Sequence, residues 1–441
     1  MMRDTSLIAL AESLVAYGTR RGADQVEVAI RSGSNFSAQV REGELETLVE
    51  AGFREASVKL IVDQKVATEA SSDLSKETLN GLIDNGIGRA RLSGADAFAG
   101  LPELEKVTVR PEALGIFDEA VAEMSPESKI AAARRAEAVC LSDKRIRRSM
   151  GSRFGTSVET LYLANSNGFS DAFAQTACSN GVYLQVGEPD NLISEGKYDY
   201  SRNLAGLMSP AEIGAEAISR STRLIGARKV PTQSVPVVLE SEMTAELLRF
   251  LASCLEGRSV YRKQSFLADR IGDRVAGTNV NVWDDGLMPG APGAKPFDRE
   301  GVPLRKTAVI EKGVLKSYLL DSYSGRKLGM KPTGNASGPN NLYLSAGDTS
   351  PADIVGSVDK GLLLTGTIGF GAVPTTGDIS RGAFGIWIEG GEPAYPVAGI
   401  TIGANLGTLL QQVEMIGNDL DHRRYVNGPT IKVAEMTVGG T

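Results

Sequence analysis

Residues 25–71 alternate apolar and polar side chains in one short run after another, and this alternation constrains the fold more than any other feature of the sequence. The runs are QVEVAIR, FSAQVRE, ETLVEAG, ASVKLIV and KVATEAS. A period of two places the apolar side chains on one face of a strand. Helical spacing flanks these runs, first before Gly22 and then from about Ser75 to Ala90. The pattern predicts a helix, a meander of strands joined by short turns, and a second helix.

The same order of elements recurs after a linker-like stretch. Helices are predicted over 125–141 and about 210–228, and the strands between them run through MGSRFGTSVETLYLANSNG, FSDAFAQTACSNGVYLQV and SEGKYDYSRNL. We interpret residues 1–229 as an N-terminal α/β region made of two related helix–meander–helix units, about 1–93 and 125–229. Such an arrangement is typical of an internal duplication.

The character of the sequence changes after the second unit. SVPVVLE is predicted as a strand, and Ser241 is placed to cap a helix that reaches Glu256, with Gly257 just beyond its end. KTAVIEKGVLKSYLLD has the pattern of a hairpin, and one late helix is predicted around 404–416. The chain is therefore predicted to be an α+β protein in which residues 230–441 form a β-rich C-terminal domain.

Charge and cysteine content limit the partners and the cellular compartment that we expect for the protein. The chain has 47 Lys and Arg against 54 Asp and Glu, a formal net charge of −7, whereas nucleic-acid-binding surfaces carry a basic excess. The cysteines, Cys140, Cys178 and Cys254, lie far apart, which is typical of a reducing compartment. The N-terminal segment has the pattern of an amphipathic helix, and no apolar run is long enough to span a membrane. We expect a cytoplasmic protein that binds neither nucleic acid nor membrane.

Metal chemistry is restricted by the histidine content, because His422 is the single histidine of the sequence. A catalytic zinc site uses three protein ligands from His, Cys, Asp or Glu and an open position for water. One histidine excludes HExxH and every other two-histidine motif. Asp419, Asp421 and His422 cluster in the sequence, and Cys254 is a further candidate donor, although such a polar segment is more often a plain loop. GxSxG and GxxxxGK[ST] motifs are also lacking.

The helix over 241–256 has a plain structural interpretation. Met243, Leu247, Leu251 and Leu255 recur every four residues and form an apolar stripe. The helix is therefore predicted to face the core.

Dense motifs in the last third of the chain carry a family resemblance. They are REGVP (299–303), VIEKGVLKSYLLD (309–321), KPTGN (331–335), TGDISRGAFGIWIEGGEPAYPV (376–397), ITIGANL (400–406), IGND (416–419) and MTVGGT (436–441). In this order they resemble the PmbA/TldD family, and SRGA, GxWIExGE and YPV resemble its PmbA (TldE) branch more than its TldD branch. The resemblance covers essentially the whole chain, thinly before about residue 230.

The resemblance also implies where a metal site would lie. TldD-type subunits of the family carry HExxxH followed by LEG, and a cysteine in a loop before the last strand, which together bind zinc for peptide hydrolysis. Aligning LEG with residues 255–257 puts Leu248 and Ser253 at the two histidine positions and Arg249 at the glutamate position. The loop corresponds to DHRRYVNGP (421–429), which has no cysteine. The resemblance therefore implies that the helix over 241–256 corresponds to the metal-binding helix of the family but lacks its metal ligands.

The resemblance thus implies a non-catalytic PmbA/TldE-type subunit that pairs with a TldD-type subunit, the pair hydrolysing extended peptides within an enclosed cavity. This chain would hold no cofactor, and the zinc would lie in the partner. Asn335, Asp378, Arg381 and Asn418 are candidate contacts for substrate or partner, and self-association into a dimer is a further option. Two alternatives stay open. One is a stand-alone metallopeptidase with an atypical metal site, and the other is a regulatory protein acting on gyrase or a gyrase inhibitor.

Overall fold

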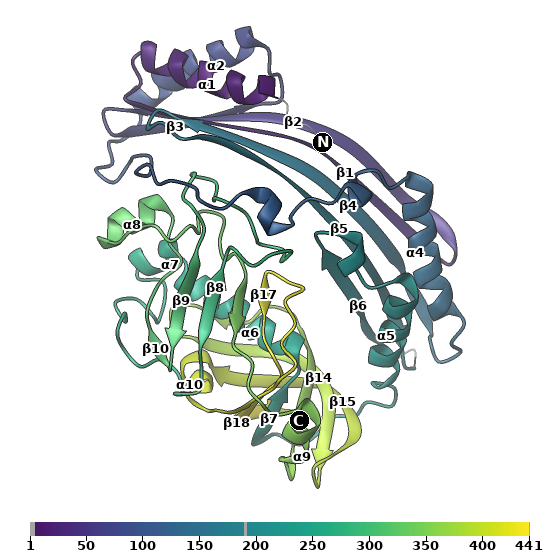
Figure 1. Ribbon diagram of the computed structural model, residues 1–441. Helices are drawn as coiled ribbons and strands as arrows, with labels where there is room; N and C mark the ends of the chain where they lie inside the picture. The colour runs from purple at the N-terminus through teal and green to yellow at the C-terminus, as the bar shows by residue number, and fades with distance from the viewer. Residues whose placement is uncertain (1–4, 189–191, 441) are drawn as a thin grey trace.

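The N-terminal half of the chain builds one long, curved sheet. The computed structural model describes residues 5–188 and 192–440, and within them this sheet has six antiparallel strands in the order β3-β2-β1-β4-β5-β6 (Figure 1). The strands are β1 (Gln25–Arg41), β2 (Glu44–Val62), β3 (Lys65–Ser71), β4 (Arg148–Asn165), β5 (Ser170–Val186) and β6 (Ile193–Ser201). Pairing of β1 with β4 joins the two predicted meanders into a single sheet.

Helices cover one face of this sheet at both of its ends. They are α1 (Thr5–Arg20), α2 (Lys76–Leu92), α4 (Pro126–Leu141) and α5 (Pro210–Thr222), and the short elements η1 (Pro111–Leu114), α3 (Glu119–Ala122) and η2 (Leu204–Gly206) lie in the connections. Val28 of β1 packs with α1 and α2, whereas Val40 of the same strand packs against α4. An even number of positions separates the two valines, so both sets of helices lie on the same face.

The strands are longer than the sequence predicts. QVEVAIR and FSAQVR both lie in β1, and ETLVEAG and ASVKLIV both lie in β2, with no turn between the two runs of either strand. Gly33, between the first two runs, marks a close approach of strands, because a Cβ there would lie 2.0 Å from the carbonyl oxygen of Val158. The turn falls later, at Glu42 and Gly43, whose φ angles are 53° and 82°.

The C-terminal half forms a closed ring of strands and a second sheet. In the ring, β7 pairs with β12 and β18, β18 with β15, β15 with β14, and β14 with β12. These strands are β7 (Gln233–Leu239), β12 (Lys360–Ile368), β14 (Asp378–Glu389), β15 (Glu392–Asn405) and β18 (Ile431–Gly439), with β13 (Ala372–Val373) on β14 and β16 (Val413–Ile416) on β18. The second sheet contains β10 (Val314–Leu315), β9 (Lys306–Glu311), β8 (Val282–Asp285), β11 (Leu342–Leu344) and β17 (Val426–Asn427), in that order.

Helix α6 (Ser241–Leu255) lies between these two strand systems. It contacts β7 and β12 of the ring as well as β11 and β17 of the second sheet, and its apolar side chains join the largest core cluster. The shorter helices are α7 (Gly257–Tyr261), α8 (Ser322–Leu328), α9 (Pro351–Gly356) and α10 (Leu406–Gln411). Among residues 5–188 and 192–440, no helix combines the length and apolar character needed to cross a bilayer.

The predicted N-cap of α6 is wrong, whereas the predicted C-terminal end is confirmed, with Glu256 as the C-cap and Gly257 just beyond it. Glu240, and not Ser241, is the N-cap residue, and it makes no side-chain capping bond. Gly257 does not end the helix in a left-handed conformation but begins α7. Glycine is needed there because a Cβ would lie 2.1 Å from the hydroxyl oxygen of Ser324.

The α+β prediction with a β-rich C-terminal region is confirmed, as is the hairpin formed by β9 and β10. The late helix is shorter than predicted. It ends at Gln411, and Val413 and Ile416 belong to β16 because they pair with Val433 and Ile431 of β18. Tertiary pairing overrides the helical spacing of these apolar residues. The proposed division into related units and domains stays a prediction.

An aromatic cluster joins the long sheet to the C-terminal half. The ring of Phe297 lies edge-to-face against Phe169 and Phe173, with centroid separations of 5.0 and 5.1 Å. Phe297 is fully buried, and Leu163 of β4 and Leu114 of η1 complete the cluster. This packing fixes the C-terminal half against the concave face of the sheet (Figure 1).

Replacing Phe297 by alanine should lower the free energy of unfolding by about 3–5 kcal/mol, because it leaves a cavity at this junction. Urea denaturation measures the change. The control is Phe370→Ala, which removes a fully exposed ring and should alter the free energy by less than about 0.5 kcal/mol. Equal effects of the two substitutions would contradict the role given to Phe297.

Buried acids lie at the same junction. Burial raises the pKa of Glu27 on β1 to about 7, against the attraction of Lys59 on β2. Burial, reinforced by repulsion from Glu300, also raises the pKa of Asp298 to about 6. Lys59 and Glu300 form a long ion pair of 3.9 Å. The folded protein therefore keeps protons on these carboxyls at a pH where the unfolded chain has released them.

Glu27→Gln should flatten the pH dependence of stability. A raised carboxyl pKa stabilises the fold below the unfolded value of 4.5 and loses that contribution as pH rises to about 7. The substitution should therefore reduce the stability lost between pH 4 and pH 8 by up to about 3 kcal/mol. Urea denaturation at both pH values measures this, with the exposed Glu435→Gln as control. Parallel profiles for wild type and Glu27→Gln would refute it.

Candidate functional site on helix α6

Helix α6 presents two different faces. One is apolar and buried, and it consists of Leu247, Leu248, Leu251 and Leu255. The other is polar and carries Glu242, Glu246 and Arg249. Residues three or four positions apart share a face of a helix, so the predicted apolar stripe also fixes which side chains point away from the core.

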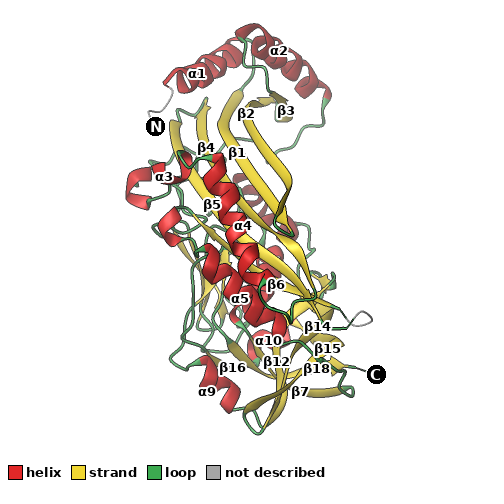
Figure 2. Cartoon of the chain, turned by 90° about the vertical axis from the view of Figure 1, so that its right-hand side faces the viewer, coloured by secondary structure: helices red, strands yellow, loops and turns green. Residues whose placement is uncertain are grey.

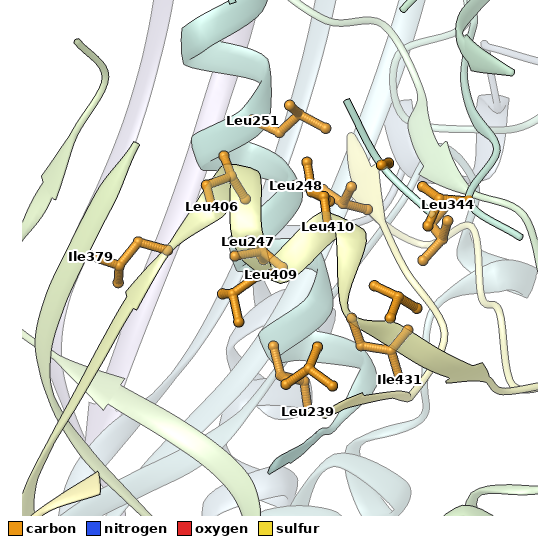
Figure 3. Packing of buried hydrophobic residues seen from close by; sticks show 14 of the residues in the cluster. Leu239, Leu247, Leu248, Leu251, Leu344, Ile379, Leu406, Leu409, Leu410 and Ile431 are labelled. Atoms are coloured by element: carbon orange, nitrogen blue, oxygen red, sulfur yellow. The ribbon is translucent and has the colours of Figure 1, made fainter. Parts of the chain in front are cut away.

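Leu248, which the family resemblance predicts at the first histidine position, is a buried core residue. Its side chain is 1 % exposed and packs in the core near Leu410 (Figure 3). The loop 421–429 packs against it, because a Cβ on Gly428 would lie 3.3 Å from Cδ1 of Leu248 and 2.4 Å from Cγ2 of Thr244. Loop and helix are in direct apolar contact.

Arg249, at the glutamate position, is exposed to solvent. Partial burial of its guanidinium lowers the pKa, an effect that Glu246 opposes and Arg424 supports. An arginine still remains charged at neutral pH. The polar face of α6 therefore carries a fixed positive charge at Arg249.

Ser253, at the second histidine position, is engaged within the helix. Its hydroxyl donates a hydrogen bond of 2.7 Å to the carbonyl oxygen of Phe250. Cys254 beside it is buried, and burial raises the pKa of its thiol to about 12. The thiol is therefore protonated at neutral pH.

Asp419 and His422, the core of the alternative metal site, have structural partners. Asp419 accepts hydrogen bonds of 2.8 Å from both the backbone N–H and the hydroxyl of Thr430. His422 packs edge-on against Tyr343 with ring centroids 4.9 Å apart, and burial lowers its pKa. The hydrogen bonds explain Asp419 without a metal ion. Nδ1 of His422 is buried without a hydrogen-bond partner among the described residues.

The donor set of this chain does not fit a zinc ion. Asp421 pairs with Arg423 at 2.9 Å. In the part of the chain that the structure describes, no group of three His, Cys, Asp or Glu side chains is arranged to hold a metal. A leucine, an arginine and a serine at the motif positions supply neither the imidazoles nor the carboxylate of a catalytic zinc site.

Glu242 ties the start of α6 to three other elements. It forms ion pairs with Lys197 of β6 at 3.1 Å, Arg220 of α5 at 3.0 Å and Arg424 of the loop 421–429 at 2.6 Å. Burial alone would raise the pKa of Glu242, but these cations outweigh it and lower the pKa. The network fixes α6 to the N-terminal half as well as to the loop.

Arg381, one of the predicted contact residues, reaches the polar face of α6. Its Nη1 donates to the carboxylate of Glu246 at 2.5 Å, while Nε and Nη2 donate to the carbonyl oxygen of Gly369 at 3.1 and 2.7 Å. The hydroxyl of Thr367 donates to the same Glu246 at 2.8 Å. The structure thus brings the predicted residues Arg249 and Arg381 together around Glu246.

The remaining predicted contact residues make no hydrogen bond or ion pair with α6 in the described ranges 5–188 and 192–440. Asn335 is buried and donates to Asp284 at 2.7 Å. Asp378 accepts from Asn405 at 2.9 Å, and the side chain of Asn418 is exposed. Their role in binding substrate or partner stays a prediction.

A large cavity opens beside the start of α6. Its volume is about 1040 Å³, and α5, α9, the β14–β15 turn and the start of α6 line it. Arg220 and Glu242 are among its charged lining residues. A second pocket shares Lys197, Ser241 and Glu242 with it, so the two adjoin along the helix. A cavity of this size accommodates a ligand much larger than one side chain.

Sequence reasoning did not single out Glu242, Glu246 or Arg424. A signal existed for the first two, because Glu242, Glu246 and Arg249 recur at spacings of four and three on a helix. Arg424 gives no such local signal, since its partner Glu242 is 182 positions away.

Comparison with known proteins agrees with this architecture. Residues 119–225 match the family model of the PmbA/TldA metallopeptidase central domain, and residues 232–440 match that of the C-terminal domain. Metalloprotease PmbA of Escherichia coli O157:H7 is 30% identical over 418 residues, which are 95% of this chain and 92% of that protein. The chain belongs to the PmbA/TldD family.

Similarity within the PmbA/TldD family is uneven. A metalloprotease TldD homolog of Buchnera aphidicola subsp. Schizaphis graminum is 31% identical over 258 residues, 51% of this chain and 52% of that protein. The structure of a proposed modulator of DNA gyrase from Bacteroides thetaiotaomicron matches with a TM-score of 0.92 and 28% identity, covering 100% of both chains. TldE from Thermococcus kodakarensis shares the fold, with a TM-score of 0.87 and 22% identity over 98% of this chain and 100% of that one.

The isolated protein should contain far less than one zinc ion per chain after treatment with EDTA, addition of zinc and desalting, because its donors do not converge. Elemental analysis measures the content. His422→Ala should give the same value, and EDTA should leave the melting temperature unchanged. Stoichiometric zinc that disappears in His422→Ala would instead support the stand-alone metallopeptidase.

Proposed function

We propose that this chain is the non-catalytic, PmbA/TldE-type subunit of a heteromeric metallopeptidase whose zinc is bound by a TldD-type subunit. The observation that carries the proposal is the state of α6, in which Leu248 is buried and Arg249 is exposed at positions that should hold a metal ligand and a general base. On this proposal, the chain retains the fold of the family but lacks the metal ligands and the general base at α6.

Arginine at this position opposes hydrolysis in two ways. Its positive charge repels a divalent cation instead of binding it. Its guanidinium also has no lone pair available to accept a proton from an attacking water, which is the task of a general base. The catalytic steps of the proposed pair therefore take place in the other subunit.

The contribution of this chain is to bind peptide and to shape the chamber. β6 is the last strand of the long sheet, and in the described residues no further strand pairs with its outer edge. Lys197 of β6 lines the large cavity beside α6. An extended peptide can add to such an edge through backbone hydrogen bonds, which suits substrates of varied sequence.

Arg381 lines a separate small pocket together with Glu246, Met243 and Phe250 of α6. Arg381, Asn335, Asp378 and Asn418 remain the proposed contacts for substrate or partner. We place the pair in the cytoplasm, because the three cysteines are free thiols buried in the fold.

Mixing this protein with the TldD-type subunit of the same organism should give a complex on gel filtration that cleaves unfolded peptides. This chain alone should show no cleavage, because it has neither the metal ligands nor the base. Changing the glutamate of the partner's HExxxH motif to glutamine should reduce cleavage by about 10²–10⁴-fold without dissolving the complex. The proposal fails if no complex elutes and the partner is equally active alone, or if this chain cleaves peptides unaided.

A further inference from the structure

The outer edge of β2 is unpaired over much of its length. β2 pairs with β1 from Glu44 to Ile61, whereas β3 pairs with it only from Ala56 to Val62. Within the described chain, residues 44–55 therefore have no strand on their outer side, and Figure 2 shows β3 beside one end of β2 only. In an antiparallel strand, alternate residues direct both their N–H and C=O groups away from the neighbouring strand.

This edge also exposes apolar side chains. Leu45, Leu48 and Val49 are 37, 48 and 49 % exposed, and all three lie in β2. A shift of register opposite Gln39 and Val40 sets Leu45 apart from the regular pairing that holds from Thr47 to Ile61. Leu48 and Val49 are adjacent, so they point to opposite faces of the sheet. A long strand with an open edge and apolar side chains on both faces is a template for pairing with another strand.

We propose that a second copy of this chain pairs with this edge, antiparallel and around a two-fold axis at Val49. The two six-stranded sheets would then continue into one another. The proposal does not depend on the peptidase role, because the edge lies outside the α6 site and its network.

The symmetry of a homodimer limits the register. Residues directly opposite each other in an antiparallel pair point to the same face of the sheet. Two identical strands related by a two-fold axis must therefore pair odd positions with odd and even with even, and one residue faces its own copy. The available centres are single residues between Glu44 and Glu55.

Strand β3 removes the centres at the far end of this stretch. Because Ser71 of β3 pairs with Ala56, the outer edge of β2 is occupied from Ala56 onward. With the axis at Glu50, Ala56 of the second copy would lie opposite Glu44, and its β3 would overlap the end of the strand. With the axis at Val49, that β3 falls at the turn, where the chain bends towards β1. Centres before Val49 fit as well but leave more of the edge unpaired.

The Val49 register gives compatible side-chain pairs. Val49 faces Val49 of the second copy, Leu48 lies opposite Glu50, and Thr47 lies opposite Ala51. No acidic residue faces another acid in this central part, where like charges would oppose pairing. The aliphatic stem of Glu50 can cover Leu48 while its carboxylate stays in water.

The glutamates of this stretch do not repel a copy strongly, because basic residues of the same chain lie close to them. Glu46 forms an ion pair with Arg41 at 3.1 Å, and Arg41 is also directly opposite Glu44 on β1. Glu50 interacts with Lys129 of α4. Charged side chains on an open edge discourage pairing with unrelated strands. Here the neighbouring basic residues partly neutralise the glutamates, so that a strand in the proposed register can still pair with the edge.

Light scattering after gel filtration, with the full chain, tests the proposal. The wild type should have twice the 46.6 kDa mass of one chain. Val49→Lys should have the mass of one chain, because it places two ammonium groups at the axis. Leu141→Lys, at a site of matching exposure on α4, should remain dimeric. Circular dichroism and melting temperature establish that both variants are folded.

Disulfide trapping tests the register. Val49→Cys should form an intermolecular disulfide under mild oxidation, since opposite Cα atoms in an antiparallel pair lie roughly 4.5–5.5 Å apart. Leu48→Cys should not, because its copy lies two positions away and beyond disulfide reach. The native thiols are buried and do not compete.

Three results would overturn the proposal. The first is a monomeric wild type, and the second is a dimer that neither Val49→Lys nor the cysteine pattern distinguishes. The third is a wild type that is monomeric alone but forms a complex with a TldD-type subunit, and this complex is weakened by Val49→Lys. The edge of β2 would then bind that subunit and not a second copy.

Discussion

The candidate site depends on the burial of one face of α6. The leucines of that face lie between the closed ring of strands and the second sheet, in the largest apolar cluster of the chain. Because this burial fixes the rotation of the helix, Leu248 must point into the core and Arg249 must point out of it. The site is therefore occupied by apolar packing on one side and by a guanidinium on the other.

The polar face of the same helix holds the two halves of the chain together. Glu242 reaches β6, α5 and the loop 421–429, while Glu246 reaches Arg381 of β14. These pairs are partly buried, where the loss of one partner is more costly than at an exposed surface. Helix α6 thereby joins the N-terminal sheet to the C-terminal half.

Local patterns in the sequence were sufficient for the element types and insufficient for strand length and for contacts between distant residues. The α+β class, the helices that flank the meanders and the β9–β10 hairpin follow from periodicity and turn residues. The predicted break between QVEVAIR and FSAQVRE does not occur, because Gly33 permits a close approach of β4 within a continuous strand. The contact of Gly428 with Leu248 and the pair of Arg424 with Glu242 could not be read locally. The family resemblance, by contrast, pointed to Leu248, Arg249 and Ser253 by position.

Counting zinc in the assembled peptidase tests the central claim most directly. Native mass spectrometry of the complex between this chain and its TldD-type subunit should show one zinc ion for each pair of chains. After gentle dissociation, the ion should stay with the TldD-type subunit. Two ions for each pair, or one that remains on this chain, would show that α6 binds metal and would contradict the account.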